Sequence, residues 1–219
     1  MTYAVFMTLR LPRTLMAVLA GAGLSLAGYI YQLLFKNILA SPDIIGVASG
    51  ANAGAALGIV VMGAGSVLVP IYAFFGGILA VLLVMLFAKN GHRNSLATIV
   101  LSGIVVSAMA EAVIMILKLL ADPNSELAPL EYWSMGGLSA ITASKVLWVL
   151  PFFLPGMVAL FLVRYQITIL GLSNEEASAL GVRVKMIRGI VLVATTVIVS
   201  AIVSVTGLIT FIGLVAPHA

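Results

Sequence analysis

Apolar residues run in six long blocks along the chain, separated by short polar stretches. Each block holds about 18 or more residues with few charges, a length typical of a membrane-spanning α-helix. The apolar positions are continuous and do not alternate every second residue, which favours helices over a β-barrel. The predicted spans are, approximately, Leu11–Leu34, Ile44–Met62, Val67–Ala88, Leu96–Ala121, Lys145–Leu162 and Ile187–Val205. A further apolar piece begins at Gly207 and continues to the end of the chain.

The pattern predicts an all-α fold, a polytopic transmembrane helix bundle with about six complete spans plus a partial one. Composition agrees, because 63% of the 219 residues are hydrophobic and 8% are charged, whereas soluble domains carry about a quarter charged residues. There is no cysteine, and His92 and His218 are the only histidines. These counts exclude thiolate sites and the usual zinc and haem sites, so we expect no cofactor and no resident metal.

The charged loops predict the orientation of the spans, because consecutive loops alternate between the two sides of the membrane. One side receives Lys36, Lys89, Arg93, Arg164, Arg183, Lys185 and Arg188. The other side receives Arg10, Arg13, Lys118 and Lys145, with the acids Asp122, Glu126 and Glu131. Positive charge favours the cytoplasm, so the first set is predicted to be cytoplasmic. We interpret the net charge of +4 as topological and expect no nucleic-acid partner.

Small residues in the second span predict close helix packing. Gly46, Gly50, Gly54 and Gly58 recur at a spacing of four and therefore form one stripe along the helix. Such a stripe indicates a packed bundle and carries no information about a substrate.

Glu111 is the only acid inside a predicted span and is therefore a functional candidate. Its side chain could face a pore or a subunit interface, or it could be a protonated glutamate in a helix contact. A functional Glu111 would suit an ion-coupled secondary transporter, although such carriers usually contain several intramembrane acids or broken helices. Lys118 lies about 10 Å further along the helix, so no direct ion pair with Glu111 is expected.

Ser49 in the stretch "VASGANAG" offers a weaker alternative, an intramembrane serine protease. A nucleophilic serine needs a base within hydrogen-bond reach, and neither histidine lies in a suitable span. We therefore predict no catalytic residue.

The stretch "SNEEASALGVRVKMIRG", Ser173–Gly189, contains five of the eighteen charged side chains. Ser173 or Asn174 can cap a short helix whose first turn carries two acids, and Gly181 can end that helix in a left-handed conformation. We expect a second short helix to begin at Val182. Two amphipathic helices on the cytoplasmic face would form a docking surface, but the residues taken alone slightly favour an ordinary solvated loop with topological charge.

Four stretches resemble the integral-membrane permeases of ABC importers for cobalamin, ferric siderophores and haem, the FecCD family. They occur in the family's order and span nearly the whole chain; one position of its "NPLA" turn differs, reading "NILA" at Asn37–Ala40. The stretches are "RLPRTLMAVLAGAGLSLAGYIYQLLFKNILASPDIIGVASGANAG" (Arg10–Gly54), "YWSMGGLS" (Tyr132–Ser139), "EEASALGVRV" (Glu175–Val184) and "GLITFIGLVAPH" (Gly207–His218).

The resemblance implies a permease subunit that pairs with a second permease subunit, taken here as a homodimer, in a bacterial or archaeal cytoplasmic membrane. Its other partners would be ATP-binding cassette ATPase subunits, which hydrolyse ATP, and an extracytoplasmic substrate-binding protein. Arg10 and Arg13, at the outer start of the first span with Pro12 in its first turn, match positions that dock the binding protein. The coupling loop, 168–188, would contact the ATPase through Asn174, Glu175, Glu176, Ala179, Leu180, Gly181 and Arg183.

The resemblance also implies subunits with about ten spans, more than the blocks counted here. We therefore interpret residues 1–219 as one partial transmembrane permease domain, lacking spans at both ends. The chain itself is not expected to be an enzyme, because it contains no GxxxxGK[ST] nucleotide motif.

Overall fold

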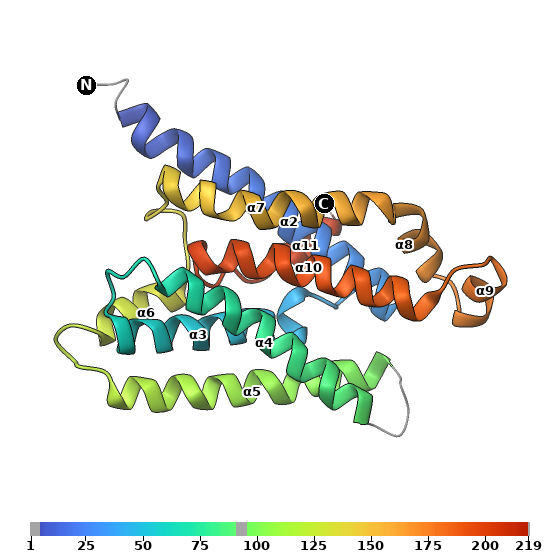
Figure 1. The fold of residues 1–219 in the computed structure, drawn as a ribbon, viewed down its shortest axis with the longest axis horizontal. Coiled ribbons are helices and arrows are strands. Elements are labelled where there is room, and N and C mark those ends of the chain that lie inside the picture. The colour runs from blue at the N-terminus through green and yellow to red at the C-terminus, as the bar shows by residue number, and fades with distance from the viewer. Residues whose placement is uncertain (1–4, 91–95, 219) are drawn as a thin grey trace.

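The computed structural model describes residues 5–90 and 96–218, and in these ranges every regular element is a helix (Figure 1). The "KNGHRNS" loop, with His92 and Arg93, lies largely outside the described residues. The elements are η1 (Phe6–Arg10), α2 (Leu11–Phe35), η2 (Pro42–Ile45), α3 (Val47–Met62), α4 (Val69–Asn90), α5 (Leu96–Leu120), α6 (Leu127–Met135), α7 (Ala143–Leu162), α8 (Arg164–Leu170), α9 (Asn174–Ala179), α10 (Val184–Thr206), α11 (Ile212–Val215) and η3 (Ala216–His218).

Five helices in the described residues are long and apolar enough to cross a membrane, and they coincide with five of the six predicted spans. The first of them is η1 together with α2, and the others are α4, α5, α7 and α10. The remaining predicted span, α3, has only 16 residues. It begins late because α2 ends at Lys36 in a left-handed conformation, and the chain then passes through the buried residues Ala40, Pro42 and Ile45. This buried return segment takes the place of the first turns expected at Ile44.

Pro12 lies in the first turn of α2, as expected, but the helical segment begins before α2. The helix already runs through Phe6–Arg10 as a π-helix, and the backbone N–H of Leu11 donates to the carbonyl oxygen of Phe6. A proline inside an α-helix lacks its hydrogen bond and clashes with the preceding turn, and a wider π-turn is one way to accommodate it. Pro12 itself is buried.

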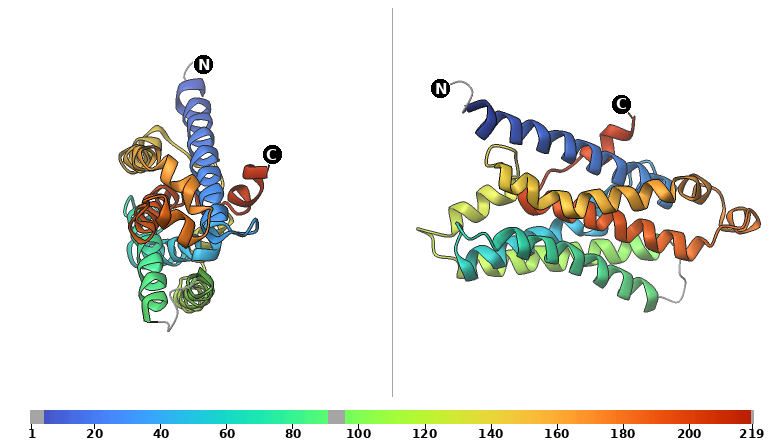
Figure 2. Two further views of the ribbon diagram at one scale, coloured as in Figure 1. Left: turned by 90° about the vertical axis from the view of Figure 1, so that its right-hand side faces the viewer. Right: turned by 45° about the horizontal axis from the view of Figure 1, so that its top comes forward.

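Helix α10 forms the centre of the bundle and packs against α2, α3, α4 and α7 (Figures 1 and 2). The most apolar 18-residue stretch of α10 is 78% buried inside the protein. The corresponding stretch of α5, at the edge of the bundle, is only 17% buried. Buried hydroxyl groups on α10 are mostly satisfied within the helix, as when Thr206 donates to the carbonyl of Ile202. The hydroxyl groups of Thr195 and Tyr31 lie 2.9 Å apart and join α10 to α2.

The glycine stripe of α3 lies against α4 and α5. A methyl group added to Gly50 or Gly54 would collide with backbone atoms of Gly76 or Tyr72 in α4. At the start of the stripe, Gly46 has a φ of +79° and faces Ser107 of α5. The stripe therefore lets helix backbones approach more closely than any larger side chain would permit.

Candidate functional site

The charged stretch, Ser173–Gly189, begins with the short helix α9 and follows another short helix, α8, and both helices project from one end of the bundle (Figure 2). Ser173 caps α9, because its hydroxyl oxygen accepts a hydrogen bond from the backbone N–H of Glu176 at 3.2 Å. The Glu176 carboxylate accepts in return from the backbone N–H of Ser173 at 2.8 Å. This reciprocal pair is a capping box, and it fixes the start of a helix that would be too short to persist alone.

The capping box also sets how α9 responds to pH. The Ser173 hydroxyl, followed by its backbone N–H, lowers the pKa of the Glu176 carboxyl. Ionised Glu176 therefore stabilises α9 at neutral pH, and this contribution is lost as the pH falls through the lowered pKa.

Gly181 ends α9 in the left-handed conformation, with a φ of +81°. The backbone N–H of Gly181 donates to Ser178, and that of Val182 donates to Ala177. These two bonds form a Schellman motif and satisfy the last carbonyls of α9. The second short helix expected from Val182 is wrong: the chain enters the membrane-spanning α10 at Val184 directly, and the second short helix is α8, before α9.

The tip of this loop presents a small apolar surface beside acidic and basic groups. Leu180 is 62% exposed, and Ala179 and Glu175 are exposed beside it. Arg188 of α10 donates to the side chain of Asn174 at 3.2 Å, which links α9 to the bundle. The loop is therefore a built projection tied to α10, with an apolar tip facing outward.

Arg10 and Arg13 lie at the opposite end of the bundle, near the N-terminus, and both are exposed. The Arg13 guanidinium donates to the backbone carbonyl of Ser139, in the connection between α6 and α7. That contact leaves further donors of Arg13 open, because guanidinium has five N–H groups.

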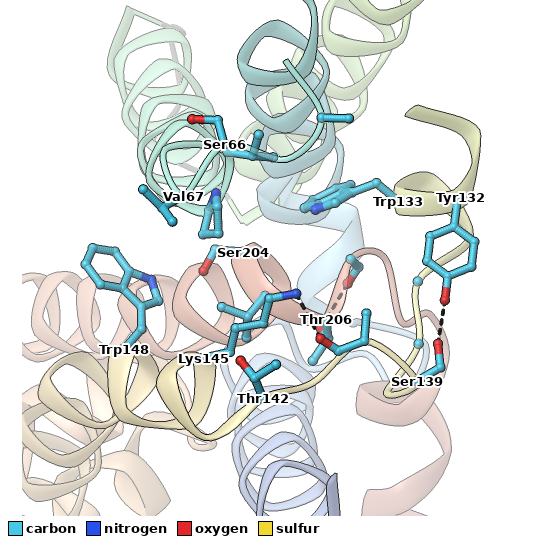
Figure 3. Close-up of a pocket in the computed structure, with 18 of the residues that line it drawn as sticks. Ser66, Val67, Tyr132, Trp133, Ser139, Thr142, Lys145, Trp148, Ser204 and Thr206 are labelled. Carbon is cyan, nitrogen blue, oxygen red and sulfur yellow. Dashed lines mark hydrogen bonds between the residues drawn. The ribbon is translucent and has the colours of Figure 1, made fainter. Parts of the chain in front are cut away.

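A cavity of about 500 Å³ opens at the same end, between α6, α7, α10 and the α3–α4 connection (Figure 3). Lys145 lies in it and donates to the carbonyl of Ala140 at 3.0 Å, while the Tyr132 and Ser139 hydroxyls are hydrogen-bonded. The buried indole nitrogen of Trp148 has no hydrogen-bond partner in the described part of the chain. The sequence did not predict this cavity, because its lining residues lie far apart along the chain, from Ala64 to Gly207.

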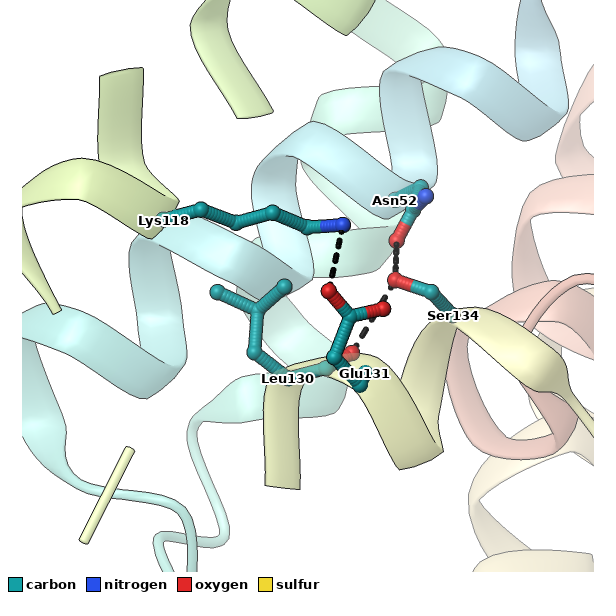
Figure 4. Close-up of polar contacts among 5 residues, drawn as sticks. All are labelled: Asn52, Lys118, Leu130, Glu131 and Ser134. Atoms are coloured by element: carbon teal, nitrogen blue, oxygen red, sulfur yellow. Dashed lines mark hydrogen bonds and ion pairs between the residues drawn. The ribbon is translucent and has the colours of Figure 1, made fainter. Parts of the chain in front are cut away.

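Polar contacts hold the connection between α5 and α6 in place. Lys118 forms an ion pair with Glu131 at 2.7 Å, and the Ser134 hydroxyl joins Asn52 of α3 to the carbonyl of Leu130 (Figure 4). The expectation that Lys118 does not pair with Glu111 agrees with this geometry. At the turn itself, the backbone N–H of Asn124 and the Ser125 hydroxyl lower the pKa of the Asp122 carboxyl.

Glu111 lies on the exposed face of α5, and its carboxylate has no hydrogen-bond or ion-pair partner within residues 5–90 and 96–218. An unpartnered acid in a membrane span needs water or another protein surface, so we expect Glu111 to face a pore or a subunit interface. Because the chain has no native cysteine, a Glu111→Cys variant can report this directly.

In the assembled protein, Glu111→Cys should react with a membrane-impermeant thiol reagent or cross-link to a neighbouring subunit. Leu154→Cys provides the comparison, because Leu154 is an apolar side chain of α7 that is 55% exposed and is expected to face lipid. If position 111 labelled only with lipid-soluble reagents, as position 154 should, the prediction would be wrong.

The candidate residues thus fall into separate places: the loop residues at one end, Arg10 and Arg13 at the other, the glycine stripe inside, and Glu111 at the edge. Among the described residues, no group of three or more His, Asp or Glu side chains could hold a metal ion.

Comparison with known proteins gives a consistent result. The sequence profile of the FecCD transport family matches residues 1–219. The chain is 35% identical to the hemin transport system permease protein HmuU of Yersinia pestis, covering 98% of this chain and 65% of that protein. It is 36% identical to the ferric enterobactin transport system permease protein FepG of Escherichia coli, covering 95% of this chain and 63% of that protein.

A solved structure of a metal-chelate type ABC transporter in an inward-facing conformation has the same fold. It matches with a TM-score of 0.90 at 32% identity, over 98% of this chain and 68% of that one. The chain spans less than two thirds of the length of the two named permeases.

Proposed function

Because the chain belongs to the FecCD transport family, we propose that it is the membrane-spanning permease subunit of an ABC importer for a metal chelate. The substrate class is a ferric siderophore, haem or cobalamin. The observation that carries the proposal is the family match over residues 1–219, supported by relatives named for hemin and ferric enterobactin transport. The five apolar helices suit a multi-pass protein of a bacterial or archaeal cytoplasmic membrane.

ATP would be hydrolysed by partner ATPase subunits that dock on the coupling loop, 168–188. The capping box and the Schellman motif support this role, because they hold α9 in a fixed shape at the end of the bundle. The exposed Leu180 suits an apolar pocket on the partner, and the flanking Glu175 and Arg183 supply charge that fixes orientation. The chain itself would perform no catalysis.

A second copy of the permease would pack at the edge of the bundle, and the transport pathway would lie between the two copies. The exposed face of α5 supports this, because it carries the acid Glu111, which is costly against lipid, on a helix that is only 17% buried. Glu111 would then lie at the subunit interface or the pathway.

The direct test is transport in proteoliposomes, with the permease assembled with its partner ATPase subunits and binding protein. We expect ATP-dependent uptake of a radiolabelled ferric siderophore, haem or cobalamin. Uptake driven by an ion gradient without ATP, and lost on Glu111→Gln, would instead favour the secondary transporter.

An extracytoplasmic binding protein would dock at the end that carries Arg10 and Arg13. Both guanidinium groups are exposed, and each suits a carboxylate partner because its fork can bind both oxygens. An Arg10→Glu/Arg13→Glu variant should therefore slow association of the binding protein by about tenfold at low salt, measured by stopped-flow fluorescence. The difference should shrink at high salt, where exposed charges are screened.

Lys36→Glu/Arg164→Glu is the matched control, because it reverses two charges at the opposite end. Partial recovery with charge-reversed carboxylates on the binding protein would support direct pairing. Equal association rates for Arg10→Glu/Arg13→Glu and the parent at low salt would leave these arginines only a role in anchoring the helix.

A further inference from the structure

A second cavity, of about 750 Å³, lies between the end of α4, the start of α10 and α9. We call it the basic pocket, because four cationic side chains line it and no acidic side chain does. These cations are Lys89, Arg183, Lys185 and Arg188. Lys89 is nearly a hundred residues away from the others in the sequence, so the fold itself brings the four charges together.

The cations of the basic pocket are not neutralised by the protein. Among residues 5–90 and 96–218, none of the four forms an ion pair. In the same ranges, Arg188 donates one hydrogen bond, to Asn174, and its buried Nε has no partner. Because a guanidinium has five N–H groups and Asn174 takes up only one hydrogen bond, Arg188, which lines the pocket, retains donors for an external acceptor.

The basic pocket also has an apolar lining and shares one residue with a neighbouring apolar groove. Met85, Ala88 and Leu192 line the pocket together with the charges. Gly189 lines both this pocket and a neighbouring apolar groove between α7 and α10, which extends to Val197. Eight residues of helix correspond to about 12 Å, so the groove runs well into the membrane-spanning part of α10.

Glycine and proline residues of α7 and α10 line the groove. Pro151, Pro155 and Gly156 form its wall on α7. At Gly189, an added methyl group would have no atom within 4 Å, so the helix surface is open there. An acyl chain that extended from the charged pocket into the groove would pass at this position.

The basic pocket lies at the end of the bundle that carries α9, the end predicted to face the cytoplasm. Anionic phospholipid headgroups lie at that depth, and basic pockets between membrane helices bind them. From this arrangement we propose that the basic pocket binds the phosphate of an anionic phospholipid, with an acyl chain in the apolar groove beside Gly189. Positive-inside topology alone accounts for the number of charges, but it does not require them to converge on a cavity with an apolar lining.

The cations of the basic pocket and the opening at Gly189 are tested separately, each with one variant and one control. Lys89→Gln/Lys185→Gln removes two charges from side chains that are exposed and make no ion pair in the described part of the chain. Gly189→Leu fills the opening without a clash at Cβ and without loss of helix propensity. Lys36→Gln/Arg164→Gln removes two charges at the same end but outside the pocket, and Gly189→Ala is the tolerated change at the same position.

Binding is measured on the purified full-length protein by native mass spectrometry, titrated with phosphatidylglycerol or with phosphatidylcholine. We expect phosphatidylglycerol to be retained in preference. Two removed charges should weaken its binding by about thirtyfold, while the two control variants should bind as the parent does. Gly189→Leu should weaken it without altering the salt dependence that the charges impose.

Other outcomes would overturn the proposal. If glycerol phosphate, which lacks acyl chains, competed as well as phosphatidylglycerol, the pocket would be a site for small anions. If Lys36→Gln/Arg164→Gln weakened binding as much as Lys89→Gln/Lys185→Gln, the lipid would respond to overall charge and not to this pocket. These readouts need neither ATP nor the partner subunits, so their failure is distinguishable from a failure of the proposed transport function.

Discussion

Replacing Gly181 by proline in the assembled importer should uncouple ATP hydrolysis from transport, while leaving the permease inserted in the membrane. Gly181 has a φ of +81°, whereas proline is fixed near −65°. Proline would also remove the N–H that donates to Ser178 and ends α9. Such strain costs about 1–3 kcal/mol. The population of the native loop conformation, relative to rearranged conformations, should therefore fall by about tenfold or more.

The measurement is substrate-stimulated ATPase activity and uptake in the same proteoliposomes. Gly181→Asn is the matched control, because asparagine tolerates the left-handed conformation and retains the N–H. Glu175→Lys/Glu176→Lys tests the same loop by removing the capping carboxylate and reversing the charge at the start of α9. If Gly181→Pro assembled with the ATPase and transported substrate as the parent does, the proposed role of 168–188 in coupling would be wrong.

A methyl group at Gly54 should markedly destabilise the bundle. Its Cβ would lie inside the contact distance of the Tyr72 carbonyl oxygen and close to Gly76, both backbone atoms of α4 that cannot rotate away. Overpacking of this kind costs about 1–3 kcal/mol. The result should be a lower midpoint of thermal unfolding in detergent for Gly54→Ala than for the parent.

Gly21→Ala in α2 provides the opposite result within the same fold. No atom lies within 4 Å of the added methyl group, and alanine is favoured over glycine in a helix by about 0.5–1 kcal/mol. The two Gly→Ala changes should therefore move the unfolding midpoint in opposite directions. If both variants shifted the unfolding midpoint in the same direction, α3 and α4 would not pack closely enough to require glycine at position 54.

Several features of the protein could be predicted from the sequence, because they depend on neighbouring residues. Continuous apolar runs are sufficient to locate the five long spans, since a span must satisfy its own backbone hydrogen bonds in lipid. The cap at Ser173 and the left-handed Gly181 follow from residue types three and eight positions apart. The long quoted motifs were likewise sufficient to indicate the family.

Other features were decided only by the tertiary structure. Ile44 and Ile45 extend the apolar run of the second predicted span, yet they belong to a buried return segment, because α5, α3 and α2 pack around it. Helix α8 lies between the fifth predicted span and the charged stretch, where no helix was predicted. The basic pocket requires Lys89 and Arg188 to meet across the α4–α10 contact. Local sequence determines where helices form, but the convergence of distant side chains depends on how those helices pack.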